Sequence, residues 1–493
     1  MKKFRRFFAA AAAVCLAAQM MPVTVGALEP VNPAGDVNRD GIFNLSDMVM
    51  FNQWMHGKGS IADTDTADMN GDSQLDVFDF IAMRKQLLGG IVSANAKYEK
   101  SGTVDLCGGI KRNHSDRKKI DSTFRNAQLS FSLDLFKHTV KEDENVLISP
   151  YSVSMALAMT ANGADGETKS EMEKTLGGLP IDDLNGYLAK LAYSQPNEEK
   201  IKIHTANSVW VRDDEALIKP APTFIQSVVD NFGAEVFKAP FNEETVKDVN
   251  NWINDHTDGM IPSVIKKFEP YDMMALINAV SFEAKWADQY EDYQIKPHDF
   301  TAYDGTVKKT DMLYSTEDYY IEDGNAAGVL KLYDQGRYGF AAILPEEGTS
   351  TYDYVKGLTT ERMQKLFSGY KSCDVETVIP KFKYESSSSL KDALVDMGMS
   401  TAFVDGTADF TKMVTPDSLK LHIGSVIHKT FIELDENGTK AAAATVVMMA
   451  GNEMMPPKEQ KEVILDRPFV YAIVDMENAL PLFIGTVNSI EEE

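Results

Sequence analysis

The amino-acid sequence predicts an α+β fold, with a small all-helical domain ahead of the larger part of the chain. Residues 124–140 carry the apolar spacing of an amphipathic helix, whereas residues 201–211 and 481–487 alternate in hydrophobicity as strands do. Helices and strands do not alternate regularly, so an α+β arrangement is favoured over a doubly wound parallel sheet. At 493 residues the chain exceeds an ordinary single core, and we expect two or more domains.

Composition places the chain among globular proteins and narrows its partners. Hydrophobic residues make up 44% and aromatic residues 10%, far from the values of disordered chains. The formal net charge of −25 repels polyanions, so we expect no nucleic-acid partner and no anionic membrane partner.

The N-terminus has the layout of a secretory signal peptide. Basic residues within 2–6 precede a short apolar run at 7–18, and the small residues Val25 and Ala27 lie where a cleavage site is expected. A transmembrane anchor would need roughly 20 uninterrupted apolar residues, more than this run provides. Residues 1–27 are thus predicted to be removed on secretion. Cys107 and Cys373 remain, and the sequence does not decide whether they pair.

Two acidic loops of matched spacing follow, DVNRDGIFNLSD at 36–47 and DMNGDSQLDVFD at 68–79. Each places side-chain oxygens at loop positions 1, 3, 5, 9 and 12, with a backbone carbonyl at position 7, as a calcium loop does. The predicted ligands are Asp36, Asn38, Asp40, Ile42, Asn44 and Asp47, then Asp68, Asn70, Asp72, Gln74, Asp76 and Asp79. One such motif is weak support, but two matched copies predict two bound calcium ions.

The paired loops, each leading into a helix-periodic run (MVMFNQWM and FIAMRKQLL), resemble the dockerin domain across residues 33–90. Dockerins dock enzymes onto the scaffold proteins of cellulosomes, and they typically carry aspartate at loop position 12, as Asp47 and Asp79 do here. The resemblance implies an extracellular, cellulosomal protein with a cohesin module as partner. Recognition in the family centres on loop positions 10 and 11, which are Leu45, Ser46, Val77 and Phe78 here.

Residues 91–122 show no sustained periodicity and are predicted to be a linker into a second domain at 123–490. Because dockerins mostly accompany glycoside hydrolases, a hydrolase is one alternative for this domain. Such enzymes need two carboxylates beside a cleft, often with aromatic platforms, and the chain holds only 4 tryptophans. No GxSxG, HExxH or phosphate-loop motif occurs, although their absence decides little.

A series of segments in fixed order gives stronger evidence about the class of this second domain. They are NVLISPYSVSMALAMTANGADGET (145–168), ANSVWV (206–211), VNNWINDHTDGMI (249–261), LINAVSFEAKW (276–286), PKFKYESSSSLKDALVDMGM (380–399), HKTFIELDENGTKAAAAT (428–445) and RPFVYAIVDMENALPLFIGTV (467–487). Together they resemble the serpin family across residues 123–490. The resemblance implies a protease inhibitor without catalytic residues, built from three β-sheets and about nine helices, with an exposed reactive loop near the C-terminus.

The segment DENGTKAAAATVVMMAGNEMMPP at 435–457 fits the inserting half of such a loop. Side chains of a strand alternate between faces, so one face would carry Thr439, Ala441, Ala443, Thr445, Val447 and Met449, all uncharged. We expect a hinge made of Glu436, Gly438, Thr439, Ala441, Ala442, Ala443, Ala444 and Thr445. A non-inhibitory serpin is the alternative within the family, and such members tend to carry bulky or charged hinge residues.

The family pattern implies two further sets of residues. A buried polar gate controls sheet opening and consists of Ser149, Ser152, Asn278, Trp286 and His428. The scissile bond lies fourteen residues beyond the glycine that matches Gly438, which gives Asn452–Glu453, with Met454 and Met455 as alternatives. No Arg or Lys lies between Ala441 and Pro457, so we expect an elastase- or subtilisin-like target rather than a trypsin-like one.

Overall fold

The structure, a computed structural model, divides into two compact units, Met1–Ser93 and Ala94–Glu493. It describes residues 35–39, 43, 45–62, 64–69, 74–89, 101–107, 110–113, 117–198, 200–439 and 459–490. The predicted signal peptide lies outside these residues. Within the described ranges, no helix combines the length and apolar character needed to cross a membrane.

Unit 1 contains the helices that were expected after the two acidic loops. They are α2 (Leu45–Met55), the short α3 (Thr64–Ala67) and α4 (Val77–Gly89). Phe51 of α2 is fully buried and stacks on Phe80 of α4, with ring centroids 6.2 Å apart. This small apolar contact holds the two loop–helix pairs together.

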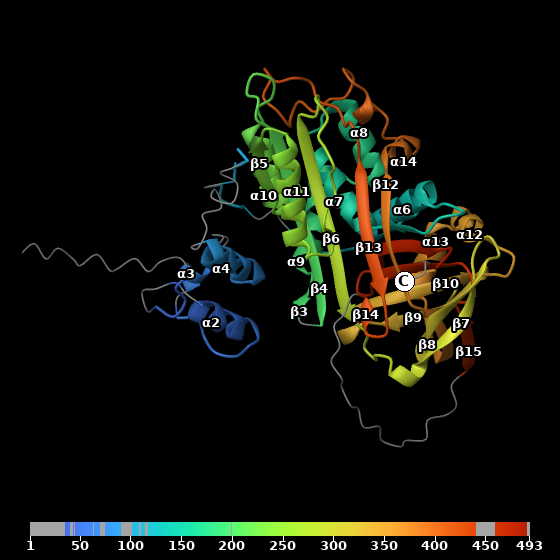
Figure 1. The fold of residues 1–493 in the computed structure, drawn as a ribbon. Coiled ribbons are helices and arrows are strands. Elements are labelled where there is room, and N and C mark those ends of the chain that lie inside the picture. The colour runs from blue at the N-terminus through green and yellow to red at the C-terminus, as the bar shows by residue number, and fades with distance from the viewer. Residues whose placement is uncertain are drawn as a thin grey trace, which may run out of the picture. The chain divides into compact units, whose positions relative to one another are not determined.

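Nine α-helices are described in unit 2, the number that the sequence analysis expected (Figure 1). They are α6 (Ser122–Thr139), α7 (Pro150–Ala161), α8 (Gly166–Thr175), α9 (Ile181–Tyr193), α10 (Pro222–Phe232), α11 (Glu243–His256), α12 (Thr351–Gly357), α13 (Thr360–Ser368) and α14 (Lys391–Asp396). Short 3-10 turns occur at η1 (Asp292–Gln294), η2 (Asp334–Gly336) and η3 (Thr401–Phe403). The helix predicted at 124–140 is α6, and it begins where the Asp121 carboxylate accepts the Phe124 amide at 3.0 Å.

The first sheet of unit 2 carries the hinge. Its strands, in spatial order, are β1 (Val104–Asp105), β5 (Glu235–Ala239), β4 (Ile201–Arg212), β6 (Met274–Lys285), β14 (Gly438–Thr439), β13 (Ile427–Leu434) and β12 (Phe382–Ser389), and β3 (Asn197–Glu198) pairs with β4. Helix α7 packs against β6. Strand β13 runs beside β6, with the short β14 between them at one end (Figure 1). The strand predicted at 201–211 is therefore confirmed as β4.

The remaining strands form a second hydrogen-bonded network. Its order is β15 (Gln460–Ile464), β11 (Lys371–Pro380), β8 (Val307–Glu322), β9 (Ala326–Leu332), β10 (Tyr338–Pro345), β16 (Phe469–Asp475), β17 (Leu480–Val487) and β2 (Val146–Ile148), and β7 (Ile295–Thr301) pairs with β8. Only the last residues of β8, Tyr320–Glu322, pair with β9. The network thus has two parts joined through one long strand, and with that junction as a boundary the unit has the three sheets expected.

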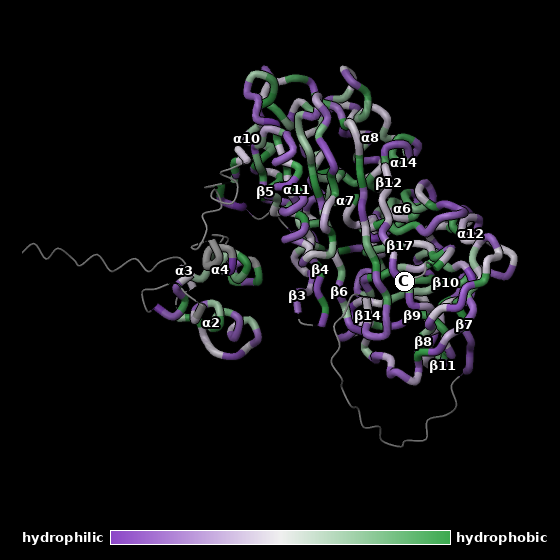
Figure 2. Tube along the Cα trace, in the orientation of Figure 1, coloured by the Kyte–Doolittle hydropathy of each residue, from purple (hydrophilic) through white to green (hydrophobic). Residues whose placement is uncertain are grey.

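The core of unit 2 includes strands that are apolar, and buried, on both faces. Every residue of β16 and β17 is buried, which matches their nearly continuous apolar sequences. By contrast, β13 alternates between buried and more exposed residues, so one of its faces is turned from the core. Figure 2 shows hydrophobic residues along β6 and hydrophilic residues gathered in outer turns.

Part of the predicted linker packs against unit 2. Val104 and Asp105 extend the first sheet by pairing with β5, and the Leu106 amide donates to the Val236 carbonyl at 2.7 Å. The Lys118 ammonium pairs with the Asp183 carboxylate of α9. The Cys107 thiol lies at β5, where it accepts the Val236 amide at 3.2 Å, whereas Cys373 is buried in β11, so the two cysteines do not form a disulfide with each other.

Candidate functional site

The hinge begins as a two-residue strand held between two long ones. Gly438 and Thr439 of β14 pair with Lys285 and Ala284 of β6, and Thr439 also pairs with Leu434 of β13. Within the described residues β6 and β13 form no ladder with each other, and β14 is the strand between them. The first sheet is therefore parted between β6 and β13, with the start of the hinge seated at one end.

Glycine is required at position 438 for two reasons. Its φ of 152° lies where residues with a side chain rarely go. A Cβ there would also meet the Ala284 carbonyl oxygen at 2.0 Å, a distance that no side chain tolerates. Gly438 thus lets the chain reverse after β13 and come close enough to β6 to pair with it.

Two stacked aromatic rings form a platform beneath the hinge. Trp286 and Tyr333 lie nearly parallel, with an interplanar angle of 8° and centroids 4.5 Å apart, and both are buried. The Tyr333 hydroxyl bonds the Thr439 hydroxyl at 2.6 Å. The Trp286 indole donates to the Asp435 carbonyl at 2.9 Å, and its backbone amide donates to the Asn437 carbonyl at 2.9 Å. The platform therefore forms hydrogen bonds both to the backbone of the turn before the hinge and to the side chain of Thr439.

Two adjacent acidic residues of the turn between β13 and β14 are fixed by charge and by backbone donors. The Glu436 carboxylate pairs with the Lys381 ammonium at 2.8 Å. Burial works to raise the pKa of Glu436, but the Lys381 contact outweighs it and leaves that pKa lowered. Burial raises the pKa of Asp435, although its carboxylate accepts the Asn437 amide at 2.7 Å and the Gly438 amide at 3.1 Å. These contacts hold the turn closed.

Four of the five predicted gate residues meet further along β6 and β13. The His428 Nε2 accepts the Ser149 amide at 2.9 Å, and the Ser149 hydroxyl donates to the Leu482 carbonyl at 2.8 Å. On the β6 side, the Ser152 hydroxyl bonds the Asn278 amide oxygen. Full burial lowers the pKa of His428 to about 4, so the imidazole is neutral at neutral pH. The N-terminus of α7 thereby links the two separated strands.

The fifth predicted gate residue, Trp286, belongs to the platform and not to this network. Three residues that contact the gate or the hinge were not predicted from the sequence. Asn207 of β4 accepts the Asn278 amide at 2.7 Å, Tyr333 bonds Thr439, and Lys381 pairs with Glu436. Asn207 lies within the segment ANSVWV, so its motif was available, whereas no local pattern marks the other two. Ala441, Ala442, Ala443, Ala444, Thr445, Asn452, Glu453, Met454 and Met455 lie outside the described residues.

The predicted calcium ligands of unit 1 are described in part. Asp36, Asp47 and Asp79 are fully buried carboxylates. Asp47 Oδ1 accepts the Asn38 amide at 3.2 Å, and the two oxygens of Asp79 accept the amides of Met69 and Asp76, each at 2.8 Å. Position 12 of each loop therefore folds back over the start or middle of its own loop, as a calcium loop requires.

The other predicted ligands fall partly within the described residues. Asn38, Asp68, Gln74 and Asp76 are also described, whereas Asp40, Ile42, Asn44, Asn70 and Asp72 lie outside the described residues. Among the residues that are described, no three acidic, histidine or cysteine side chains gather closely enough to hold a metal by themselves. The donor set of buried carboxylates and amide oxygens still suits a hard cation such as calcium.

The predicted recognition positions of unit 1 lie in the first turns of its two main helices. Leu45 and Ser46 begin α2, and Val77 and Phe78 begin α4. Ser46 is exposed and Val77 half-buried. Equivalent positions of the two copies therefore carry different side chains.

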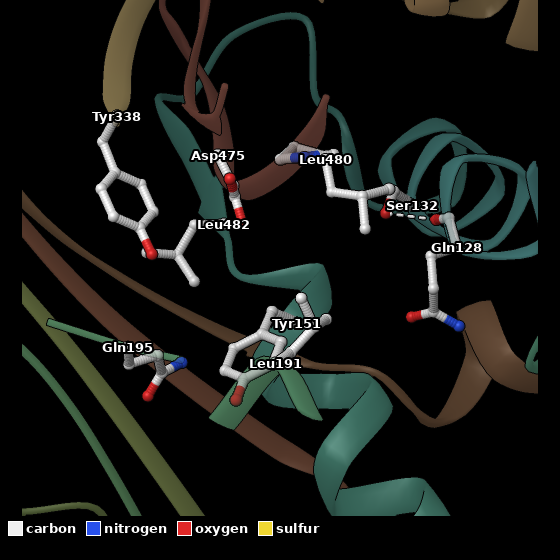
Figure 3. Close-up of a pocket in the computed structure, with 10 residues that line it drawn as sticks. Gln128, Ser132, Tyr151, Leu191, Gln195, Tyr338, Asp475, Leu480 and Leu482 are labelled. Atoms are coloured by element: carbon white, nitrogen blue, oxygen red, sulfur yellow. Dashed lines mark hydrogen bonds between the residues drawn. The ribbon is translucent and has the colours of Figure 1, made fainter. Parts of the chain in front are cut away.

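A cavity of about 40 Å³ lies elsewhere in unit 2, between α6, α7 and the turn from β16 to β17. Figure 3 shows Tyr151 and Gln195 on one side of it and Tyr338 and Asp475 on the other. Its volume suits a few water molecules at roughly 10–15 Å³ each. Neither the hinge nor the gate lines this cavity, so it does not belong to the site described above.

Comparison with known proteins assigns both parts of the chain. A family model described as Serpin (serine protease inhibitor) matches residues 126–490, and one described as Dockerin type I domain matches residues 34–88. Among curated relatives, an uncharacterized serpin-like protein of Thermococcus kodakarensis is 32% identical over 73% of this chain and 84% of its own length. Leukocyte elastase inhibitor of Xenopus tropicalis is 30% identical over 73% of this chain and 97% of its own length.

Solved structures agree with this assignment. The thermophilic serpin tengpin in its native state superposes with a TM-score of 0.74 at 43% identity, covering 79% of this chain and all of that chain. Human thyroxine-binding globulin superposes with a TM-score of 0.66 at 23% identity, which shows the shared fold alone.

Proposed function

This chain belongs to the serpin family and carries a dockerin type I domain, and on that premise we propose that it inhibits a serine protease by inserting its own cleaved loop between β6 and β13. The family is described as serine protease inhibitors rather than enzymes, so the chain needs no catalytic residue of its own. The observation that carries the proposal is β14, which is already paired with a strand on each side.

The register of β14 determines what each inserted residue would meet. Continued along both strands, it would put Ala441 between Phe282 and Ile432, and Ala443 between Val280 and Thr430. These four flanking residues are 2–5% exposed, so a side chain inserted at either position would enter a closely packed interior that admits small, uncharged groups most readily. The alanines of the hinge fit that requirement, and bulkier or charged side chains would not.

The same register accounts for the two polar residues that come next after Thr439, one on each face. Thr445 would lie between Asn278 and His428, where a hydroxyl can bond the polar groups of the gate. Lys440, the only charged residue between Thr439 and Asn452, would lie on the opposite face between Glu283 and Glu433. Insertion thus places the single cation between two carboxylates and leaves no charge on the buried face.

Insertion is strongly favourable on this accounting. Each ladder hydrogen bond contributes on the order of 1 kcal/mol net, and about ten residues would gain about two bonds each, on the order of 20 kcal/mol in all. Burial of Val447 and Met449 adds roughly 1.5–3 kcal/mol each. Ordering ten residues costs about 10–15 kcal/mol, so the net gain is on the order of 10 kcal/mol. Proteolytic release of stored strain is the established behaviour of serpin loops. The uncleaved fold is therefore metastable, because its own loop prevents the sheet from closing.

Inhibition depends on the relative rates of two steps, insertion of the loop and hydrolysis of the acyl bond. The protease nucleophile forms an acyl bond with the loop, and insertion must carry the enzyme away before water breaks that bond. We place the scissile bond at Asn452–Glu453, with Met454 and Met455 as alternatives. The absence of Arg and Lys from 441–457, and the likeness to leukocyte elastase inhibitor, support an elastase- or subtilisin-like target.

The dockerin domain would determine where the inhibitor is located, by binding a scaffold protein. Two calcium ions, held by the oxygens of residues 36–47 and 68–79, would neutralise the buried carboxylates and fix the first turns of α2 and α4. Leu45, Ser46, Val77 and Phe78 would then meet a cohesin module of a scaffold protein. The protein is thus a secreted, cellulosome-associated inhibitor that protects its assembly from proteolysis.

A protease panel tests the inhibitory proposal. The full chain is mixed with an elastase, a subtilisin and trypsin, and each mixture is examined by denaturing electrophoresis and by mass spectrometry of the released peptide. We expect a complex that survives denaturation with elastase or subtilisin and none with trypsin. Cleavage of the loop by all three enzymes without any stable complex would mean that the chain is a non-inhibitory serpin.

A further inference from the structure

A buried ion pair lies beneath the platform, and neither of its members touches the hinge. Lys331 of β9 has a side chain only 3% exposed, and its ammonium lies 2.7 Å from a carboxylate oxygen of Glu317 on β8. The same ammonium lies 4.5 Å from the centre of the Tyr290 ring and 5.4 Å from the centre of the Trp286 ring. One cation thus contacts two aromatic side chains at once.

Those two aromatic residues are the ones whose backbone amides hold the hinge. The Trp286 amide donates to the Asn437 carbonyl at 2.9 Å, and the Tyr290 amide donates to the Glu436 carbonyl at 3.0 Å. A cation over an aromatic face attracts the ring and restricts its orientation, most strongly where water is excluded. Lys331 is therefore connected to the hinge through one intermediate residue along each of two routes.

Further hydrogen bonds fix the ion pair from below. The Ser315 hydroxyl lies 2.5 Å from Glu317 Oε1, 2.9 Å from the Thr377 hydroxyl and 3.3 Å from the Tyr290 hydroxyl. Burial works against the charged form of Lys331, but electrostatic interaction with Tyr290 and Glu317 leaves its pKa raised, so it stays protonated. The ammonium is thus held in place by three strands of the second network.

A buried ion pair contributes little net free energy to the stability of a fold. Removing two charges from water costs several kcal/mol per ion, and apolar side chains of similar volume are often as stabilising. We infer that Lys331 is a positioning residue for loop insertion: by ordering Trp286 and Tyr290, it keeps the hinge seated between β6 and β13 so that pairing continues from Thr439 without delay. This inference rests on the proposed inhibitory function.

The chain offers a matched control. Arg362 of α13 pairs with the buried Asp323 carboxylate at 2.7 Å and lies over the Tyr354 ring at 5.5 Å. It is also a largely buried cation with an acidic and an aromatic partner, but its side chain contacts Asp323, Gly357 and Tyr354 and not the hinge or the platform. Arg362→Met therefore reproduces the loss of a buried ion pair without affecting hinge positioning.

The first test measures partitioning with the protease that forms the complex. Lys331→Met should raise the number of inhibitor molecules consumed per protease about fivefold, because insertion slows while acylation is unchanged. The rate of loop cleavage should stay at the wild-type value. Glu317→Gln, which keeps the side-chain volume, should move partitioning in the same direction, and Arg362→Met should leave it unchanged. Equal partitioning in Lys331→Met and wild type, or an equal rise in Arg362→Met, would overturn the positioning role.

A second test does not depend on inhibition. Hydrogen exchange is followed in the uncleaved protein for peptides spanning residues 285–291 and 435–439. Faster exchange in both peptides is expected for Lys331→Met and Glu317→Gln, but not for Arg362→Met. If wild type forms no complex with any protease, the proposed function fails, and this exchange pattern alone decides whether Lys331 positions the hinge. Unchanged exchange in both variants would refute the positioning role.

Discussion

Thr439→Arg tests whether the hinge must enter the sheet. Thr439 is 3% exposed, lies between Ala284 and Leu434, and its hydroxyl shares a hydrogen bond of 2.6 Å with the Tyr333 hydroxyl. An arginine there has no acidic partner among these neighbours and far exceeds the volume that threonine fills. We expect the arginine to remain outside the sheet and to keep the following residues from starting to pair.

The size of the effect follows from burial. An uncompensated buried charge costs several kcal/mol, and loss of the Tyr333 bond adds about 1 kcal/mol. If about 3 kcal/mol of this sum raises the barrier to insertion, the insertion rate falls on the order of 100-fold. Hydrolysis of the acyl bond then wins the race, and the inhibitor becomes a substrate.

The assay is titration of a fixed amount of protease with increasing inhibitor, with Thr439→Val as control. Valine keeps the shape of threonine and loses only the hydroxyl, so it should inhibit nearly as well as wild type. Thr439→Arg should be cleaved at the wild-type rate yet leave no complex after denaturing electrophoresis. A Thr439→Arg variant that still forms the stable complex would show that this position does not enter the sheet.

Two further predictions concern pH and calcium. Because the folded pKa of His428, about 4, lies below its ordinary value of 6.5, the stability that neutral His428 contributes is fully present above pH 6.5 and is lost toward pH 4, by about 1.4 kcal/mol per unit. Urea unfolding of wild type and His428→Gln between pH 7 and pH 4.5 should show this slope in wild type only, and equal slopes would contradict it. Chelation of calcium should remove the helical circular dichroism signal of α2 and α4, whereas an Asp47→Ala/Asp79→Ala variant should show no further loss. A signal unchanged by chelation in wild type would exclude calcium-dependent folding of this domain.

Local patterns in the sequence were enough to predict much of the fold. Alternation at 201–211 and 481–487 corresponds to β4 and β17, and the apolar spacing at 124–140 corresponds to α6. Helix α6 and β4 form where the periodicity of the chain matches a buried face, so little tertiary information is needed. Strand β17 is buried on both faces, so its nearly continuous apolar sequence, and not alternation, is what the structure reflects there. The structure also brings together Ser149, Ser152, Asn278 and His428, which the family pattern had grouped, and their role as a gate stays a prediction.

Partners that are distant in the chain could not be predicted in the same way. Lys381 pairs with Glu436, and Tyr333 bonds Thr439, only because β12, β13 and β14 bring these segments together. Lys331 is a single lysine in an apolar strand, and its burial depends on an acidic residue of the neighbouring β8. Such contacts depend on register and packing across strands, for which a sequence without periodic signal gives no indication.

The most direct test of the insertion mechanism is the stability of the molecule before and after the loop is cut. The purified protein is nicked within residues 440–458 by a catalytic amount of subtilisin or elastase, and thermal unfolding of intact and nicked forms is compared. If the severed segment joins β6 and β13 as the register of β14 indicates, the nicked form should unfold about 10–20 °C above the intact form, because a net gain on the order of 10 kcal/mol raises the midpoint of so large a domain by roughly 1–2 °C per kcal/mol. A nicked form that melts at or below the temperature of the intact protein would contradict insertion.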